Sequence, residues 1–169
     1  MLDVRKLSDK YKVRKLVEKD CPRILDLQQS NPLYFEYCPP RPSIKTVLKD
    51  MSVLPPEKDI DDLYYVGFFE EEYLLAILHF IISFPDKGTI YIGLFMVDRR
   101  YSGYGMGSRI IRDVLDYFQH RGFLKVRLGY IKGNPQAKAF WRKCGFVPLM
   151  EKKNNQGEVV ILEKYLPHL

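Results

Sequence analysis

Cysteine is scarce in this chain of 169 residues, and long apolar runs are missing. The three cysteines, Cys21, Cys38 and Cys144, are odd in number and widely spaced, which fits neither a disulfide framework nor a zinc-binding pattern. The most apolar run, residues 73–84, is interrupted by His79 and falls short of the roughly 18 apolar residues that a membrane span needs. We therefore expect reduced thiols, no metal site and no membrane anchor.

The N-terminus offers no sign of export. Its first fifteen residues carry basic side chains, but they contain no apolar segment and no cleavage site of small residues. Repeats, low-complexity tracts and linkers are also missing, and the length suits one domain that spans residues 1–169. We therefore expect a single-domain cytoplasmic protein.

Basic side chains exceed acidic ones, and the formal charge at pH 7 is +6. Clustered lysine and arginine would favour binding to nucleic acid. Here, however, 21 acidic residues are interleaved with 27 basic ones. We do not expect nucleic acid as the main partner, and a basic module that associates with RNA is kept only as an alternative. A local bias towards an anionic cofactor accounts for the charge equally well.

Hydrophobic periodicity predicts strands and helices in a definite order. Strands are predicted over residues 12–18, 63–69, 73–84, 89–98 and 124–131, followed by a closing hairpin over 146–150 and 159–166. Helices are predicted over 22–30, 43–51 and 135–144, and a long amphipathic helix runs from Met106 to a stop at Gly122. Asp20 and Ser43 are the expected caps of the first two helices. The order β-α-α-β-β-β-α-β-α-β-β predicts a mixed α/β fold of the α+β type, in which about four helices flank a largely antiparallel sheet of about seven strands.

Residues 31–43 are rich in proline and aromatic side chains, a composition that breaks regular structure. We expect this segment to form a wall or lid rather than core. Its aromatic residues Tyr34, Phe35 and Tyr37 suggest a pocket for an apolar or cationic amine. Ordinary aromatic packing is the alternative.

A glycine-rich stretch, RRYSGYGMGSRII at residues 99–111, precedes the long helix. Gly103, Gly105 and Gly107 stand at alternate positions, so backbone N–H groups can approach an anion closely. The start of the helix adds unpaired N–H groups and the positive end of its dipole. The loop therefore predicts a phosphate site, with a flexible turn as the alternative. It is neither a Walker loop nor a dinucleotide fingerprint, because it has no lysine and reads G-x-G-x-G after an antiparallel meander.

Two motifs together resemble a known family. Arg100-x-x-Gly103-x-Gly105 is similar to the coenzyme A motif R/Q-x-x-G-x-G/A of the GNAT superfamily of acyl-CoA-dependent N-acyltransferases. Downstream, the segment from Asn134 to Phe146 resembles the N-x-x-A-x-x-Φ-Φ-x-x-x-G-F pattern of that family's last helix. The motifs cover residues 89–147, whereas the first sixty residues match in element order only. The resemblance implies an acetyltransferase that uses acetyl-CoA as its co-substrate, with no metal expected.

The resemblance also implies where coenzyme A binds. The backbone of Phe95, Met96 and Val97 would hold the pantetheine arm, between two strands that splay apart near Gly129. Asn134 would contact the pantetheine or cap the last helix. Phe140 would line the same site or pack in the core. The pyrophosphate would lie against the amides of Arg100, Tyr101, Ser102, Gly103, Tyr104 and Gly105.

The reaction implied by the resemblance is direct attack of a neutral amine on the thioester, with a backbone N–H near Met96 stabilising the oxyanion. The family often places a tyrosine near the leaving sulfur, where this chain has Trp141, whose indole is too weak an acid. Tyr130 is the expected substitute, although the thiolate could also leave unprotonated or through water. The candidate bases are Glu36, His79 and the run Glu70 to Glu72.

The sequence does not identify the molecule that accepts the acetyl group. We expect an amine of a small molecule or of a peptide or protein, and homodimerisation is left open. The alternative function is a catalytically degenerate module that binds acetyl-CoA as a sensor, which the absence of the usual tyrosine supports.

Overall fold

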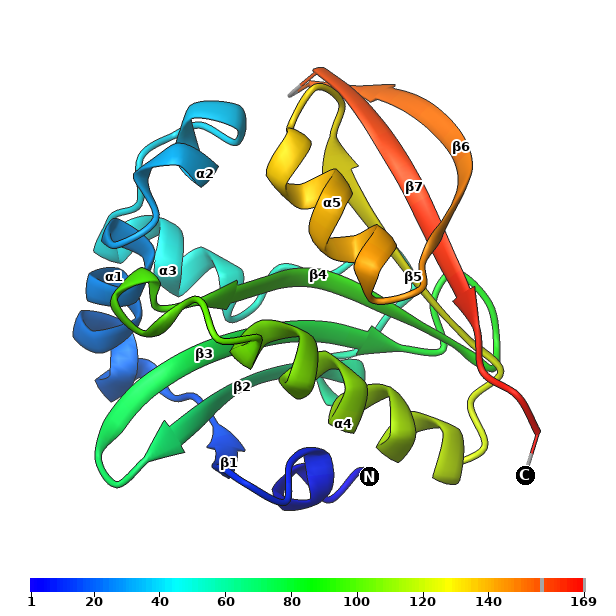
Figure 1. Cartoon of the computed structure of the whole chain (residues 1–169), viewed down its shortest axis with the longest axis horizontal. Coiled ribbons are helices and arrows are strands. Elements are labelled where there is room, and N and C mark those ends of the chain that lie inside the picture. Colours follow the sequence, from blue (N-terminus) through cyan, green and yellow to red (C-terminus); the bar gives the residue numbers. More distant parts are fainter. Residues whose placement is uncertain (156, 169) are drawn as a thin grey trace.

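One mixed sheet organises residues 1–155 and 157–168, the part of the chain that the computed structural model describes. Its seven strands lie in the order β1-β2-β3-β4-β5-β7-β6 (Figure 1). The strands are β1 (Lys12–Lys15), β2 (Leu63–Glu70), β3 (Tyr73–Ile82), β4 (Thr89–Val97), β5 (Lys125–Ile131), β6 (Val147–Asn154) and β7 (Gly157–Tyr165). β4 and β5 pair in parallel, and the other pairings are antiparallel. The predicted fold class is therefore confirmed.

Helices cover both faces of the sheet. In the described residues the α-helices are α1 (Cys21–Gln29), α2 (Pro32–Tyr37), α3 (Ile44–Asp50), α4 (Met106–His120) and α5 (Pro135–Lys143). Short 3-10 turns occupy Val4–Leu7, Glu18–Asp20, Ile60–Asp62 and Arg99–Tyr101. α1 and α3 pack against one face, whereas α4 packs against the other and crosses in front of β2 and β3 in Figure 1.

Alternating side chains of β2 explain why the sheet needs cover on both sides. Tyr64, Val66 and Phe68 belong to the cluster under α4. Tyr65 and Phe69 belong to the cluster formed with α1 and α3. Since successive side chains of a strand point to opposite faces, β2 is an interior strand that reads as one continuous apolar run.

The segment 31–43 contains a helix that the sequence interpretation excludes. α2 begins at Pro32, which stands in the first helical turn, where a missing N–H costs no internal hydrogen bond. The helix ends at Tyr37, shortly before the prolines that start at Pro39. The structure therefore has one helix more than the predicted order.

The loop between β1 and α1 also differs from the prediction. β1 stops short of the predicted range 12–18. Asp20 stands at the N-cap of α1, but its side chain makes no cap hydrogen bond to the helix. Its carboxylate instead accepts from the N–H of Val17 and from Arg14, both at 2.8 Å. Ser43, in contrast, caps α3 as predicted.

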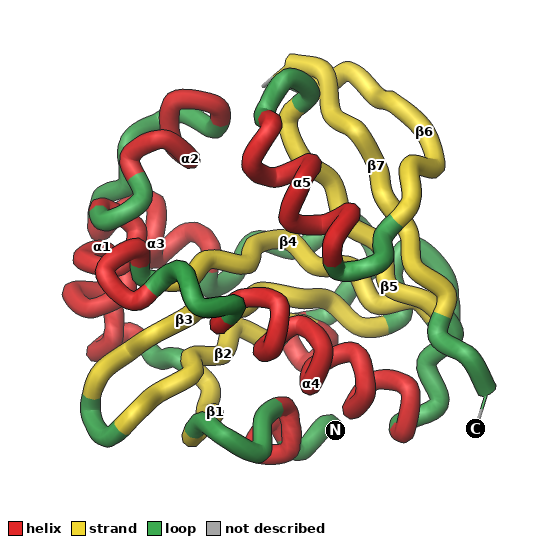
Figure 2. Tube along the Cα trace, in the orientation of Figure 1, coloured by secondary structure: helices red, strands yellow, loops and turns green. Residues whose placement is uncertain are grey.

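β4 and β5 pair over only part of their lengths. The pairing runs from Thr89 opposite Lys125 to Ile92 opposite Leu128. Beyond that point β4 continues along β3 and β5 continues along β7, so the two strands diverge (Figures 1 and 2). The register of β4 against β3 shifts at Gly93, and such a bulge bends a strand. The splayed strands expected from the resemblance are therefore present.

Gly129 does not interrupt β5 itself. It pairs with Ile161 of β7, and β5 continues beyond it. A Cβ at this position would lie 2.8 Å from Cγ1 of Val159 and 3.3 Å from Oη of Tyr91. The close approach of these neighbours, rather than a break in the strand, therefore requires glycine.

The second half of the chain follows the prediction closely. α4 ends at His120, and Gly122 follows with a positive φ of +87°. β6 and β7 form the closing hairpin, although Gln156 in its predicted turn lies outside the described residues. None of the described helices has the length and hydrophobicity that crossing a membrane would require.

Candidate functional site

Three cavities meet where β4 and β5 diverge. The loop cavity, of about 380 Å³, lies between the glycine loop, α5 and the α1–α2 junction. The cleft cavity, of about 220 Å³, lies between the diverging parts of β4 and β5. The helix cavity, of about 350 Å³, lies between helices α1 to α3 and strands β3 and β4. Tyr34 of α2 lines all three, so α2 is the wall that they share.

The glycine loop presents free amides to the loop cavity. Gly103 and Gly105 have φ angles of +98° and +75°, which a residue with a Cβ adopts only with strain. Among the described residues, nothing accepts a hydrogen bond from the N–H groups of Gly103, Tyr104 and Gly105. The first turn of α4 adds the amides of Gly107 and Ser108, because a helix leaves its first N–H groups without internal partners. Such a set of donors suits phosphate oxygens.

The first part of the predicted phosphate cradle is already engaged. The N–H of Arg100 donates to Oδ1 of Asp98 over 2.9 Å, and the N–H of Tyr101 donates to the Asp98 carbonyl over 3.0 Å. The N–H of Ser102 donates to the Arg99 carbonyl over 3.3 Å. These amides stabilise a 3-10 turn, so the available donors begin after Ser102.

The Arg100 side chain clamps the loop to the rest of the fold. Its guanidinium pairs with Asp98 and with Asp26 of α1. The Asp98 side chain is only 3% exposed. Burial alone would raise the pKa of Asp98, but the hydrogen bonds from Arg100 outweigh it and hold that pKa below its usual value. Arg100 therefore positions the loop and does not line the loop cavity.

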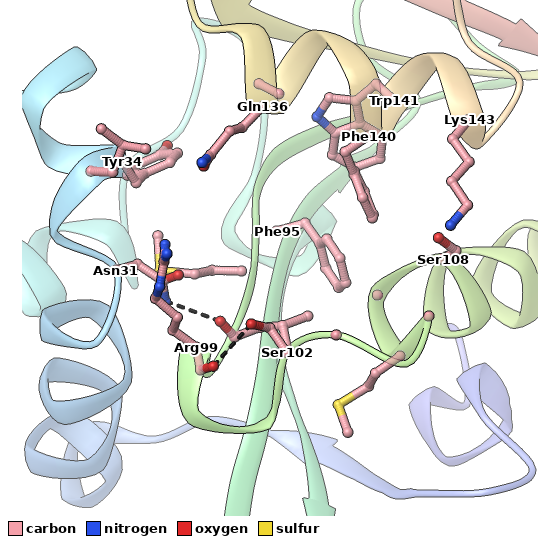
Figure 3. A pocket seen from close by; sticks show the side chains of 18 of the residues that line it. Asn31, Tyr34, Phe95, Arg99, Ser102, Ser108, Gln136, Phe140, Trp141 and Lys143 are labelled. Atoms are coloured by element: carbon pink, nitrogen blue, oxygen red, sulfur yellow. Dashed lines mark hydrogen bonds between the residues drawn. The ribbon is translucent and has the colours of Figure 1, made fainter.

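Two more hydrogen bonds join the end of α1 to the end of β4. Nδ2 of Asn31 donates to the carbonyl of Val97, and the N–H of Arg99 donates to Oγ of Ser30, each over 3.0 Å. Asn31 and Arg99 both line the loop cavity (Figure 3). This junction therefore sets one wall of the cavity.

Beyond Ile92, the edge of β4 that faces β5 is not paired with it. The N–H of Asp98 donates to the carbonyl of Leu75 over 2.8 Å, so these residues form a hydrogen-bonded pair next to the β3–β4 ladder. Because such pairs alternate along an antiparallel ladder, Met96 also bonds to β3. The amide groups of Phe95 and Val97 then point away from β3, towards the space left by β5. A free N–H is thus expected on the neighbours of Met96 rather than on Met96 itself.

Aromatic side chains of β4 and α5 form another wall of the loop cavity (Figure 3). The rings of Phe95 and Phe140 stack with centroids 5.8 Å apart. Trp141 packs edge-on against Phe140 at 4.9 Å and against Phe146 of the core at 5.3 Å. Trp141 is 8% exposed, so it serves as core residue and cavity wall together.

Asn134 and Tyr130 lie at the cleft cavity. Oδ1 of Asn134 accepts from the N–H of Ala137 over 3.2 Å, so Asn134 caps α5. It also lines both the loop cavity and the cleft cavity. Tyr130, the expected proton donor, is half-buried and lines the cleft cavity beside Gly129.

The helix cavity contains several titratable side chains. Burial lowers the pKa of His79, an effect that the backbone of Asp50 partly opposes. Burial raises the pKa of the Asp50 carboxyl to about 6. Burial, with Cys38 and Asp50 nearby, holds the pKa of the Tyr34 phenol well above its usual range. At neutral pH the cavity therefore contains a neutral imidazole, a neutral phenol and a carboxylate.

The other predicted bases lie elsewhere. Glu36 and the run from Glu70 to Glu72 are exposed, and they line none of the three cavities. Of the expected bases, His79 is the one that the fold places at a cavity. No group of three or more His, Cys, Asp or Glu side chains within the described ranges is arranged to hold a metal ion.

Of the residues at the loop cavity, Asn31, Gln136 and Lys143 escaped the sequence interpretation, whereas Tyr34 was expected at a pocket. Tyr34 and Gln136 point towards one another across the loop cavity, and Lys143 extends towards Ser108 at the start of α4 (Figure 3). Gln136, Phe140 and Lys143 follow the spacing i, i+4, i+7, which places them on one face of α5. That spacing was a usable signal. No signal in the sequence could have placed Asn31 at the cavity, because its position depends on the contact between the end of α1 and the end of β4.

Comparison with known proteins agrees with this geometry. The acetyltransferase (GNAT) family matches residues 18–146. The search of curated proteins gives no match. Among solved structures, an acetyltransferase from Thermus thermophilus superposes with a TM-score of 0.71 at 20% identity, covering 92% of this chain and 96% of the other.

Two further structures are similar at the level of the fold. The ribosomal-protein-S18-alanine N-acetyltransferase from Escherichia coli has a TM-score of 0.69 at 15% identity, covering 94% of this chain and 95% of its own. The PaiA N-acetyltransferase from Thermoplasma acidophilum, solved in complex with coenzyme A, has a TM-score of 0.66 at 16% identity, with coverages of 92% and 99%. Since the family match spans most of the sequence and includes both motifs, the chain belongs to the acetyltransferase (GNAT) family.

Proposed function

We propose that the protein transfers an acetyl group from acetyl-CoA to a primary amine, in a ternary complex formed where the loop and cleft cavities meet. The observation that carries this proposal is the continuity of these cavities, since Phe95, Asn134 and Trp141 line both. A ligand held at the glycine loop can therefore extend into the space between the diverging strands. The coenzyme A complex of a protein with the same fold supports the choice of donor.

The walls of the loop cavity fit coenzyme A chemically. The free amides of residues 103–105 and of the first turn of α4 suit the pyrophosphate, and Lys143 adds a positive charge nearby. The free edge of β4 offers the N–H groups of Phe95 and Val97 and the carbonyl of Phe95 to the amides of the pantetheine arm, whereas the carbonyl of Val97 already accepts from Asn31. Acetyl-CoA supplies a thioester, so that transfer forms a C–N bond, breaks a C–S bond and moves one proton from nitrogen to sulfur.

Phe95 is the residue that we assign to the oxyanion. Its N–H faces away from β3, and it lines both the loop cavity and the cleft cavity. A donor fixed in this way favours the negative charge that develops on the thioester oxygen. The assignment specifies the donor expected near Met96 as its neighbour Phe95, because the backbone of Met96 itself bonds to β3.

Proton transfer is assigned to two side chains. Tyr130 would protonate the leaving sulfur, since it lines the cleft cavity, whereas the indole of Trp141 is too weak an acid. His79 would accept the amine proton, because it is neutral and its cavity shares Gly93 and Leu94 with the cleft cavity. Glu36 gains no support, as it is exposed and outside the cavities.

The test combines binding and turnover. Saturating acetyl-CoA, at about 100 times its Kd, should add about 2.7 kcal/mol of stability. For a domain of this size that corresponds to a rise in Tm of roughly 5–10 °C. Thiol release should then require an added amine. Stabilisation without thiol release for any amine in a broad panel would favour the sensor alternative, and the absence of stabilisation would refute both.

A further inference from the structure

The helix cavity is an anionic site in a basic protein. Among the described residues that line it, Asp50 is the only one with a formal charge at neutral pH, since burial keeps His79 neutral. The chain as a whole carries a charge of +6. The charge of this cavity is therefore negative, whereas the net charge of the protein is positive, and a negative cavity favours a cationic ligand.

Burial desolvates the Asp50 carboxylate. None of the described residues forms an ion pair or a hydrogen bond with this half-buried side chain. Asp50 is also the last residue of α3, where the negative end of the helix dipole disfavours a second negative charge. Its pKa rises to about 6 through burial, and the neighbouring Lys49 offsets only part of that rise. A cation bound beside Asp50 would relieve this unfavourable environment.

The other walls of the cavity suit a short alkylammonium chain. Tyr34 and Phe35 meet edge to face at 4.9 Å, and aromatic faces attract a cation. Val53 and Leu94 provide apolar surface for methylene groups. The volume of about 350 Å³ lies within the range of roughly 300–1,000 Å³ typical of small-molecule sites.

The helix cavity opens towards the cleft cavity. Tyr34, Cys38, Gly93 and Leu94 line both. One flexible molecule can therefore have one end between the splayed strands and the other end beside Asp50. The two ends of such a molecule need opposite charge states. The amine that attacks the thioester must be neutral, whereas the group beside Asp50 must be a charged ammonium.

We propose that the acceptor is an aliphatic diamine or polyamine, whose reacting amine lies in the cleft cavity while its second ammonium group lies against Asp50 in the helix cavity. This inference rests on the proposed acetyl transfer and specifies its substrate class. A monoamine of equal length would leave the Asp50 carboxylate uncompensated. A peptide without a positively charged group would not gain the contact with Asp50, which is the charged side chain among the described residues that line the helix cavity.

Calorimetry on the wild-type protein with saturating coenzyme A tests the proposal without requiring turnover. Diaminobutane and diaminopentane should bind about 10- to 100-fold more tightly than butylamine and pentylamine, because an ionic hydrogen bond to Asp50 is gained. Asp50→Asn should reduce this preference to less than threefold. Asp50→Glu, which keeps the charge, should retain it. Asp61→Asn removes the same charge from an exposed position outside the cavities and should leave the preference unchanged.

Equal affinity of wild type for diamines and monoamines would overturn the proposal, and so would an unchanged preference in Asp50→Asn. Peptides that bind more tightly than the diamines would overturn it as well. Circular dichroism shows whether Asp50→Asn folds. If it does not fold, the comparison of diamines with monoamines on the wild-type protein still tests the proposal. Since the acetyl-CoA thermal shift is measured separately, failure of the substrate class is distinguishable from failure of acetyl transfer itself.

Discussion

The imidazole of His79 occupies the space where a side chain on Gly93 would lie. A Cβ built on Gly93 would be 2.6 Å from Nδ1 of His79, closer than side chains approach one another. The two residues face each other at the bulge where β4 leaves β5. The glycine therefore permits both the position of His79 and the bend of the strand.

Gly93→Ala should force His79 out of its place and destabilise the protein by about 1–3 kcal/mol, as expected for overpacking. Urea unfolding measures this loss. In a His79→Ala background the same substitution should cost clearly less, because the clashing ring is gone. Equal losses in the two backgrounds would contradict the steric explanation.

Gly105→Val should abolish the thermal shift with acetyl-CoA while the protein stays folded. The added side chain would stand at the lining of the loop cavity, where it would crowd the proposed phosphate, and apart from its chain neighbours none of the described residues has an atom within 4 Å of the Cβ position. Its positive φ makes the substitution strained as well, at a cost of about 1–2 kcal/mol.

Gly122→Val is the matched control, since Gly122 has a similar φ of +87° and open space at the opposite end of α4. It should lose similar stability and keep the full acetyl-CoA shift. If both variants kept the shift, the glycine loop would be only a turn.

Tyr130→Phe should lower thiol release roughly 100-fold, within the range that a positioned general acid contributes, while the affinity for acetyl-CoA stays nearly unchanged. Steady-state kinetics with a thiol reagent measure the rate. Trp141→Phe, which removes an N–H from the neighbouring wall, should stay within about tenfold of wild type. An unaffected Tyr130→Phe rate would point to departure of the thiolate through water.

Arg100→Gln should destabilise the protein more at pH 7 than at pH 3. The pKa of Asp98 is depressed in the folded state, so its contribution is present above the pKa of the unfolded chain and is lost as the pH falls through the folded pKa. Without the guanidinium, the carboxyl keeps the hydrogen bonds from the backbone N–H of residue 100 and from Ser30, but burial is opposed less strongly and most of that contribution is lost. Unfolding curves at the two pH values test this sign, and a pH-independent loss would contradict it.

The sequence predicted the elements that its own local pattern encodes. α4 follows from apolar side chains repeated every three or four residues and from the stop signal at Gly122, two residues after its last residue. The strands from β2 to β4 follow from tight turns between β-rich runs. The glycine loop was recognised because its spacing is local. The fold class therefore required no knowledge of long-range contacts.

The rest depended on contacts between distant segments. The prolines around residues 31–43 concealed α2, because Pro32 is harmless at a helix start although the same residue breaks a helix interior. Tyr34 lines all three cavities, and the start of its helix is anchored by the hydrogen bond from Asn31 to Val97, 66 residues away. Likewise, the engaged amides of Arg100 to Ser102 follow from the conformation of a turn, which no spacing of glycines reveals.

The short parallel contact between β4 and β5 divides the sheet into two blocks, β1 to β4 and β5 to β7, that share a seam of four residue pairs. Hydrogen bonds across this seam are few, so side-chain packing of the helices has to couple the unfolding of one block to that of the other. A ligand that contacts both β4 and β5 adds interactions between the two blocks. Amide hydrogen exchange in β5 to β7 should then slow when a ligand binds to β4, although no residue of β6 or β7 supplies the phosphate loop.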